Sequence, residues 1–125
     1  QRALTAFAVV LKAQPAALSE MLLAIDFFLD RPREIAIITP EGNKAAADPF
    51  LNRFRKHYLP SRVLVVASQG DDLDQKARVI PLVRSRTAGD HSAVAYICQE
   101  NTCSAPATDP DAFEKVSSLQ EKYYK

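Results

Sequence analysis

Apolar residues follow two patterns along this chain. In residues 2–13 and 15–29 they recur every three or four positions, so we expect two successive helices at the start of the chain. In residues 34–39, 62–67 and 93–98 they form short, nearly continuous runs. Runs of this length are typical of strands that are buried on both faces, as in a parallel sheet.

Proline marks where two further helices begin. Asp48-Pro49 and Asp109-Pro110 each fit an N-cap residue followed by a first-turn proline. Residues 68–92 predict irregular chain with one helical turn near residues 74–79. The order of elements predicts an α/β fold: a small three-stranded parallel sheet flanked by helices, with an N-terminal helical pair.

Composition limits the class of protein. A chain of 125 residues with 47% hydrophobic residues predicts a single domain with an ordinary core. The net charge of +1 indicates no general attraction to nucleic acid. No apolar run approaches the roughly 20 residues that span a bilayer, so we expect no membrane partner. Two cysteines are too few for a secreted disulfide scaffold, so we expect a reducing, cytoplasmic location.

The familiar catalytic and cofactor motifs are missing. Three isolated glycines exclude both a dinucleotide-binding G-x-G-x-x-G and a phosphate-binding G-x-x-x-x-G-K motif. A G-x-S-x-G nucleophile elbow is also absent. We therefore expect no cofactor and assign no catalytic residue.

Both cysteines lie in one segment, AYICQENTCSAPATDP, residues 95–110. Three interpretations stay open. Cys98 is a buried packing residue and Cys103 a loop thiol; or the two form a structural or redox-active disulfide across four intervening residues; or they bind metal with His57 and His91. Because neither histidine has zinc-type spacing, we expect no metal site.

Polar residues follow each of the three predicted strands. The carboxyl ends of parallel strands share one edge of a sheet, where ligands of α/β proteins usually bind. The candidates for this edge, which suit a small molecule or a sugar, are Thr39, Asp71, Asp72, Asn101 and Thr102.

Three segments in order carry a family resemblance: PREIAIITPEG, FRKHYLPSRVLVV and AVAYICQENTCSAPATDP. They resemble the C-terminal domain of the spermatogenesis-associated, thioredoxin-domain-containing proteins and their bacterial YyaL-type relatives. The helix AALSEMLLAIDFFL is similar to the segment before that domain's first strand. In this family a thioredoxin-like domain and a helical toroid precede a small α/β domain.

The resemblance implies that this chain is a piece of a longer multidomain protein. Residues 1–30 would form a helical junction to an upstream toroid, and residues 31–125 an α/β core. We therefore expect a non-catalytic accessory domain that contacts the toroid and thioredoxin-like domains, with an apolar surface around Leu4, Phe7 and Leu11. One alternative is a redox switch or thioredoxin substrate at Cys98 and Cys103. The other is small-molecule or sugar binding at the strand ends.

Overall fold

The structure is a computed structural model that describes residues 2–56 and 61–119. The chain divides into two compact units, residues 1–32 and residues 33–125. None of the described helices is long and apolar enough to cross a membrane. His57 lies outside the described residues.

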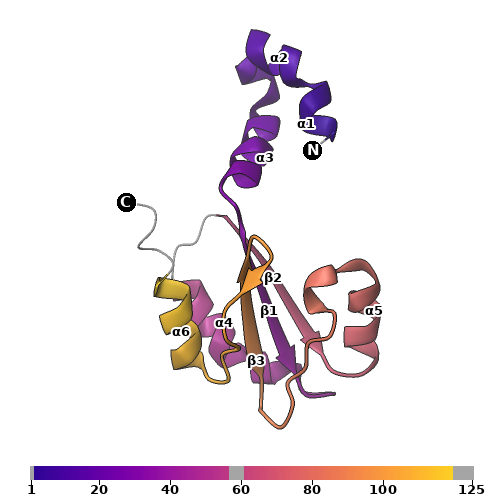
Figure 1. Ribbon diagram of the computed structural model, residues 1–125, viewed down its shortest axis with the longest axis vertical. Coiled ribbons are helices and arrows are strands. Elements are labelled where there is room, and N and C mark those ends of the chain that lie inside the picture. The colour runs from indigo at the N-terminus through magenta and orange to yellow at the C-terminus, as the bar shows by residue number, and fades with distance from the viewer. Residues whose placement is uncertain (1, 57–60, 120–125) are drawn as a thin grey trace. The chain divides into compact units, whose positions relative to one another are not determined.

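The first unit is helical. It contains α1 (Arg2–Ala6), α2 (Ala8–Ala13), the 3-10 turn η1 (Pro15–Leu18) and α3 (Ser19–Leu29), as Figure 1 shows. The helix predicted for residues 2–13 is interrupted at Phe7, and the one predicted for 15–29 begins with a 3-10 turn that has Pro15 at its start. Leu11 is the one buried side chain among the described residues of this unit.

The second unit is a sheet with helices. Its elements are β1 (Arg33–Thr39), η2 (Lys44–Ala47), α4 (Asp48–Lys56), β2 (Arg62–Ser68), α5 (Asp71–Val79), η3 (Pro81–Val83), β3 (Val94–Gln99), β4 (Thr102–Cys103) and α6 (Pro110–Leu119). The three apolar runs form β1, β2 and β3, as predicted. The four strands lie in the order β2-β1-β3-β4.

The predicted three-stranded parallel sheet is wrong. Only β1 and β2 are parallel, whereas β3 is antiparallel to β1 and β4 is antiparallel to β3. The cause lies between β2 and β3. The chain rises through α5 and then descends again before β3 begins (Figure 1), so that Val94 pairs with Ile38 and Cys98 with Glu34. A continuous apolar run reports that a strand is buried on both faces, but not which way it runs.

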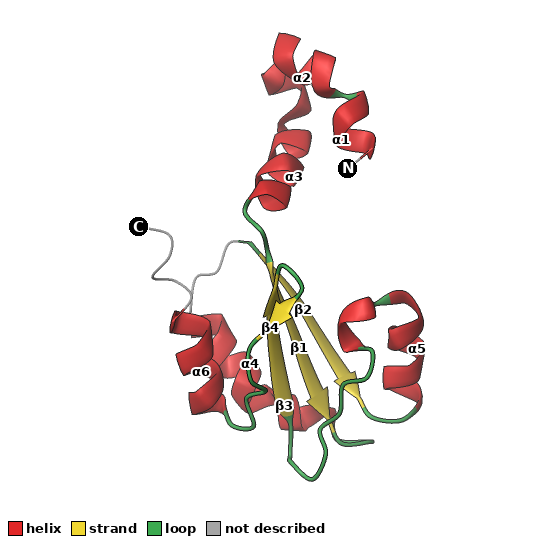
Figure 2. Cartoon of the chain, in the orientation of Figure 1, coloured by secondary structure: helices red, strands yellow, loops and turns green. Residues whose placement is uncertain are grey.

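Helices cover both faces of this sheet (Figure 2). On one face, α4 and α6 bring together Phe50 and Phe113, whose rings meet edge to face with centroids 5.9 Å apart. On the other face, α5 and η3 pack Leu73 and Val83 against a second apolar cluster that includes Tyr96. The sheet therefore separates two small cores.

The helix start predicted at Asp109-Pro110 is confirmed, because the Asp109 carboxylate caps α6 by accepting the Ala112 N–H at 2.8 Å. α4 begins at Asp48, but Asp48 itself has helical angles, φ −57° and ψ −42°, and continues directly from η2, so it is not the N-cap that the sequence predicts. Where one helical turn was predicted, α5 spans nine residues. Gly70, at φ +84°, precedes α5 in a conformation that favours glycine.

Candidate thiol–disulfide site

The two cysteines face each other across a tight hairpin. Glu100 and Asn101 form its turn, with φ of +50° and +63°, the two positive values that a type I′ hairpin turn requires. Cys98 at the end of β3 is thereby paired with Cys103 on β4, and their sulfurs are bonded, with Cα atoms 4.0 Å apart. Of the three interpretations of the cysteines, the structure contains the disulfide.

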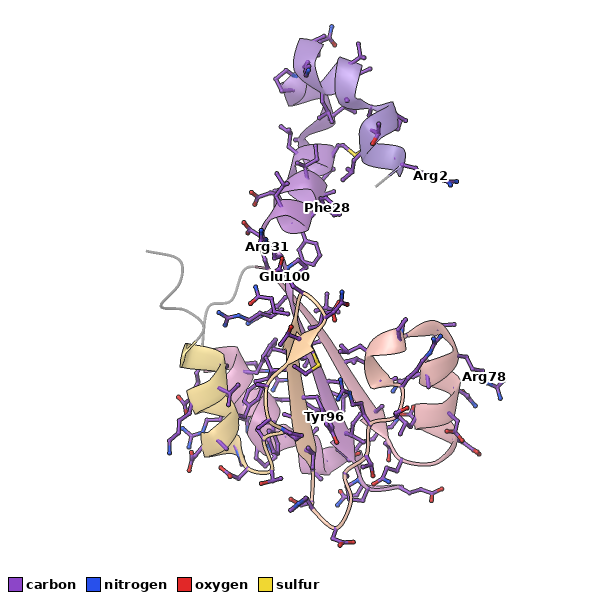
Figure 3. All side chains as sticks on the ribbon, viewed as in Figure 1. Arg2, Phe28, Arg31, Arg78, Tyr96 and Glu100 are labelled. Carbon is purple, nitrogen blue, oxygen red and sulfur yellow. A yellow bond between two sulfur atoms is a disulfide. The ribbon has the colours of Figure 1, made fainter. Side chains whose placement is uncertain are left out.

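The two sulfur-bearing residues differ in access to solvent. Cys98 is 3% exposed, on the β3 face that α5 and η3 cover, whereas Cys103 is exposed on the short outer strand. Cys103 also lines a shallow depression of about 330 Å³ together with Glu100, Thr102 and Ser104. Figure 3 draws the disulfide as a yellow bond beside the hairpin that carries Glu100. A reagent from solvent therefore reaches Cys103 more readily than Cys98.

An arginine guanidinium lies against both sulfurs. Nη2 of Arg86 is 3.1 Å from Sγ of Cys103 and 3.6 Å from Sγ of Cys98. The same guanidinium lies over the ring of Tyr96, with 4.6 Å from Cζ to the ring centroid. The Arg86 Nε is buried and has no hydrogen-bond partner. The positive charge of Arg86 thus lies at the disulfide, and its Nε–H group lacks a hydrogen-bond acceptor there.

Local backbone bonds hold Arg86 in this place. The chain leaves η3 through Ser85, which has a left-handed φ of +58°. Immediately after Arg86, the Tyr96 hydroxyl donates to the Thr87 carbonyl at 2.7 Å and accepts from the Thr87 N–H at 3.4 Å. Tyr96 therefore supports the guanidinium with its ring and anchors the adjoining backbone with its hydroxyl.

Arg86 is the site residue that sequence reasoning missed. It lies in the stretch 68–92, which the sequence predicts as irregular chain, and its contact to the sulfurs depends on the antiparallel course of β3. One signal was available: Arg86 is a cation in a loop directly before the cysteine-bearing strand. The sequence does not show that its side chain returns over that strand.

The five polar residues predicted at one sheet edge lie at two opposite ends. Because β3 is antiparallel, Asn101 and Thr102 stand beside the beginning of β1, whereas Thr39 ends it. The prediction that they share an edge is wrong for the same reason as the parallel sheet. Asp71 and Asp72 line a separate open depression of about 430 Å³. Thr39 is buried, its hydroxyl has no hydrogen-bond partner, and it does not line that depression.

Asp72 is occupied by contacts within the protein. Its carboxylate accepts hydrogen bonds from the Lys76 ammonium at 2.8 Å, the Ser68 N–H at 2.8 Å and the Lys44 ammonium at 3.1 Å. The hydrogen bonds from Lys76, then Ser68, then Lys44 hold the pKa of Asp72 well below its ordinary range. This geometry ties the start of α5 to the end of β2 and leaves little of the carboxylate for a ligand.

The part of the chain that the structure describes contains no cluster of metal-binding side chains. No group of three histidine, cysteine or carboxylate side chains there is placed to hold an ion. His91 lies in an exposed loop, and both cysteines are in the disulfide.

Comparison with known proteins gives one set of relatives. The chain is 30% identical over 115 residues to spermatogenesis-associated protein 20 of Homo sapiens, and equally so to the proteins of that name from Rattus norvegicus and Mus musculus. No family model matches the chain, and no solved structure matches it significantly. The resemblance seen in the sequence is confirmed: over 90% of its length the chain is related to spermatogenesis-associated protein 20, of which it spans 14%.

Proposed function

We propose that this chain is an accessory domain of a longer protein, and that its Cys98–Cys103 pair undergoes reversible thiol–disulfide exchange. The observation that carries the proposal is a bonded cysteine pair in which one residue, Cys103, is exposed and has a guanidinium nitrogen 3.1 Å from its sulfur. Reactive cysteines are found in such partly exposed, electropositive surroundings.

The hairpin does not depend on the bond for its register. Its two-residue turn and the pairing of Gln99 with Thr102 already align β3 and β4. The bond can therefore open without a large rearrangement of the sheet. In a reducing compartment, where we expect this protein, disulfides are usually transient and serve catalysis or redox sensing.

The exchange consumes a dithiol of the thioredoxin type or two molecules of a simple thiol. Two thiols are oxidised to a disulfide, and the Cys98–Cys103 bond is reduced to two thiols with two electrons and two protons. The family resemblance supports a thioredoxin-like domain of the same longer protein as the reductant.

The proposal is tested by counting free thiols on the folded chain. The chain is equilibrated in glutathione buffers of defined potential, quenched and alkylated. Mass spectrometry then gives the number of alkylated thiols. We expect half-reduction between about −220 and −320 mV, the range of the cytosolic glutathione pool. A Cys98→Ala/Cys103→Ala variant, which has no thiol to alkylate, is the control. A bond that survives at every potential, or thiols that never oxidise, would refute exchange.

A second candidate function is docking of the helical unit against the remainder of the longer protein. Large apolar side chains of the helical unit are exposed, as expected of a surface that a partner covers; they include Phe7 before α2, Val9 in α2, and Leu22, Leu23, Phe28 and Leu29 in α3. Of the apolar surface expected around Leu4, Phe7 and Leu11, Phe7 is exposed, Leu4 is partly buried and Leu11 is buried. The relatives are much longer than this chain, which leaves ample protein to cover such a surface.

Hydrogen exchange distinguishes docking from an uncovered helical unit. We expect amides of α3 to exchange more slowly in the full-length protein than in this 125-residue chain. A Leu23→Ser substitution should remove that protection, whereas Asp26→Ser on the same helix should retain it. Equal exchange in the two proteins would contradict docking.

A further inference from the structure

We infer that exchange at this disulfide has one direction: an incoming thiolate attacks Sγ of Cys103, and Cys98 leaves as a thiolate that Arg86 stabilises. This inference rests on the proposed function and names the chemical role of each of the three residues.

Access selects the attacked sulfur. Cys98 is 3% exposed and lies under the segment that carries Arg86, whereas Cys103 is exposed and lines an open depression. Attack at Cys103 joins the incoming sulfur to Sγ of Cys103 and breaks the Cys98–Cys103 bond. The bonding electron pair moves onto Sγ of Cys98. A second thiolate then attacks the incoming sulfur of the mixed disulfide and releases Cys103 as a thiolate.

The first step places a negative charge on a buried atom. A buried anion without a counter-charge is strongly unfavourable. Nη2 of Arg86 is 3.6 Å from Sγ of Cys98, so the counter-charge is in place before the bond breaks. A thiolate accepts a charge-assisted hydrogen bond, which is stronger than the contact that a disulfide sulfur offers.

The guanidinium has capacity for an anionic partner. Its Nε is buried without a hydrogen-bond partner. Within the part of the chain that the structure describes, no carboxylate forms an ion pair with this guanidinium. Its described contacts are the two sulfurs and the Tyr96 ring. Reduction therefore supplies the charge that this arginine lacks in the disulfide form.

Two carboxylate-bearing residues lie near the cysteines, and a negative charge there does not favour a thiolate. Glu34 on β1 is the register partner of Cys98, and Glu100 lies in the hairpin turn beside the depression at Cys103. Tyr96 presents its ring to Arg86 and its hydroxyl to Thr87. Among the described residues, Arg86 is the cation in hydrogen-bond contact with the sulfurs, so it carries the stabilisation.

The test measures how fast 2-mercaptoethanol reduces the disulfide in four versions of the chain. This thiol is uncharged until it ionises, so it lacks the carboxylates through which glutathione would be attracted to arginine. We expect Arg86→Gln to slow reduction about tenfold, from the loss of one hydrogen bond to a charged group. Arg86→Lys should recover part of the rate, because lysine keeps a point charge. Arg78→Gln, which removes an equal charge from the exposed face of α5 (Figure 3), should react as the parent does.

Equilibrium and product give two further readouts. Because Arg86 favours the reduced form, Arg86→Gln should lower the midpoint potential by about 30 mV, the equivalent of tenfold for a two-electron couple. In the parent chain, acid-quenched mixed disulfide should be found on Cys103 by peptide mapping. Mixed disulfide on Cys98 would overturn the assignment of the attacked sulfur, even if the Arg86 variants did not fold.

The two proposals fail in different ways. If the parent chain is not reduced at any potential, the proposed function fails and this inference falls with it. If the parent is reduced but Arg86→Gln has the same rate and potential, exchange stands and the role of Arg86 is refuted. Urea unfolding of each variant shows whether a slower rate comes from a disturbed fold.

Discussion

Reducing the Cys98–Cys103 bond should lower the stability of the sheet unit by an amount that follows from the loop it closes. The bonded residues are five positions apart. For a loop this short, the chain-entropy relation gives about 2 kcal/mol of stabilisation through the unfolded state. That corresponds to roughly a thirtyfold change in the ratio of folded to unfolded protein.

Urea unfolding followed by circular dichroism measures this difference, because the chain contains no tryptophan for fluorescence. The oxidised chain is compared with the same chain in excess reductant. With a slope of about 1–3 kcal/mol per molar urea, the reduced chain should unfold about 1 M earlier. The Cys98→Ala/Cys103→Ala variant should have the same urea midpoint with and without reductant.

Equal midpoints for the oxidised and reduced chains would refute this reasoning. They would mean that the hairpin turn already keeps the cysteines together in the unfolded chain, so that the bond removes no further freedom. A difference several times larger than expected would also contradict it, because the entropy of a short loop cannot supply that much.

Two further predictions concern the helices. Asp72→Asn should cost about 1–2 kcal/mol of unfolding free energy at neutral pH, since the partly exposed carboxylate loses charge-assisted hydrogen bonds from Lys76 and Ser68. The folded-state pKa of Asp72 is depressed, so this stability is present above its ordinary value of 3.8 and is lost as the pH falls below it. The gap between the unfolding curves of parent and variant should therefore begin to narrow below about pH 4 and close only as the pH falls through the depressed folded-state pKa, and a gap that did not narrow at all in acid would contradict the assignment. Phe113→Ala should lower the free energy of unfolding in urea by about 3–5 kcal/mol, because it removes the buried ring that meets Phe50 edge to face and leaves a cavity. Phe113→Leu should lower it clearly less.

Burial and capping were predictable from the sequence. Each apolar run became a strand because β1 and β3 are covered on both faces and β2 is largely covered. Asp109-Pro110 began a helix because a short carboxylate before a proline satisfies the first N–H groups. These features depend on neighbouring residues, which a sequence pattern records directly.

Strand direction and the contact between Arg86 and the cysteines were not predictable in the same way. Both depend on how far residues 80–93 travel before β3 begins, and no local pattern records that distance. α5 was underestimated because few apolar residues mark it: Leu73 and Ala77 face the core, and no side chain of the helix is fully buried. Acidic residues in its first turn and basic residues in its last were the available signal.

The chain after the hairpin turn also determines how this sheet meets other molecules. Residues 102–107 follow the outer side of β3, where Ser104 donates to the Ile97 carbonyl and Ala107 exchanges two hydrogen bonds with Ala95. Within the described residues, β2 has no strand on its outer side, although the Lys76 ammonium binds the Val66 carbonyl there at 2.8 Å. Unpaired strand edges are where β-proteins aggregate by strand addition. Self-association of this domain would therefore begin at β2, and loss of Lys76 would encourage it.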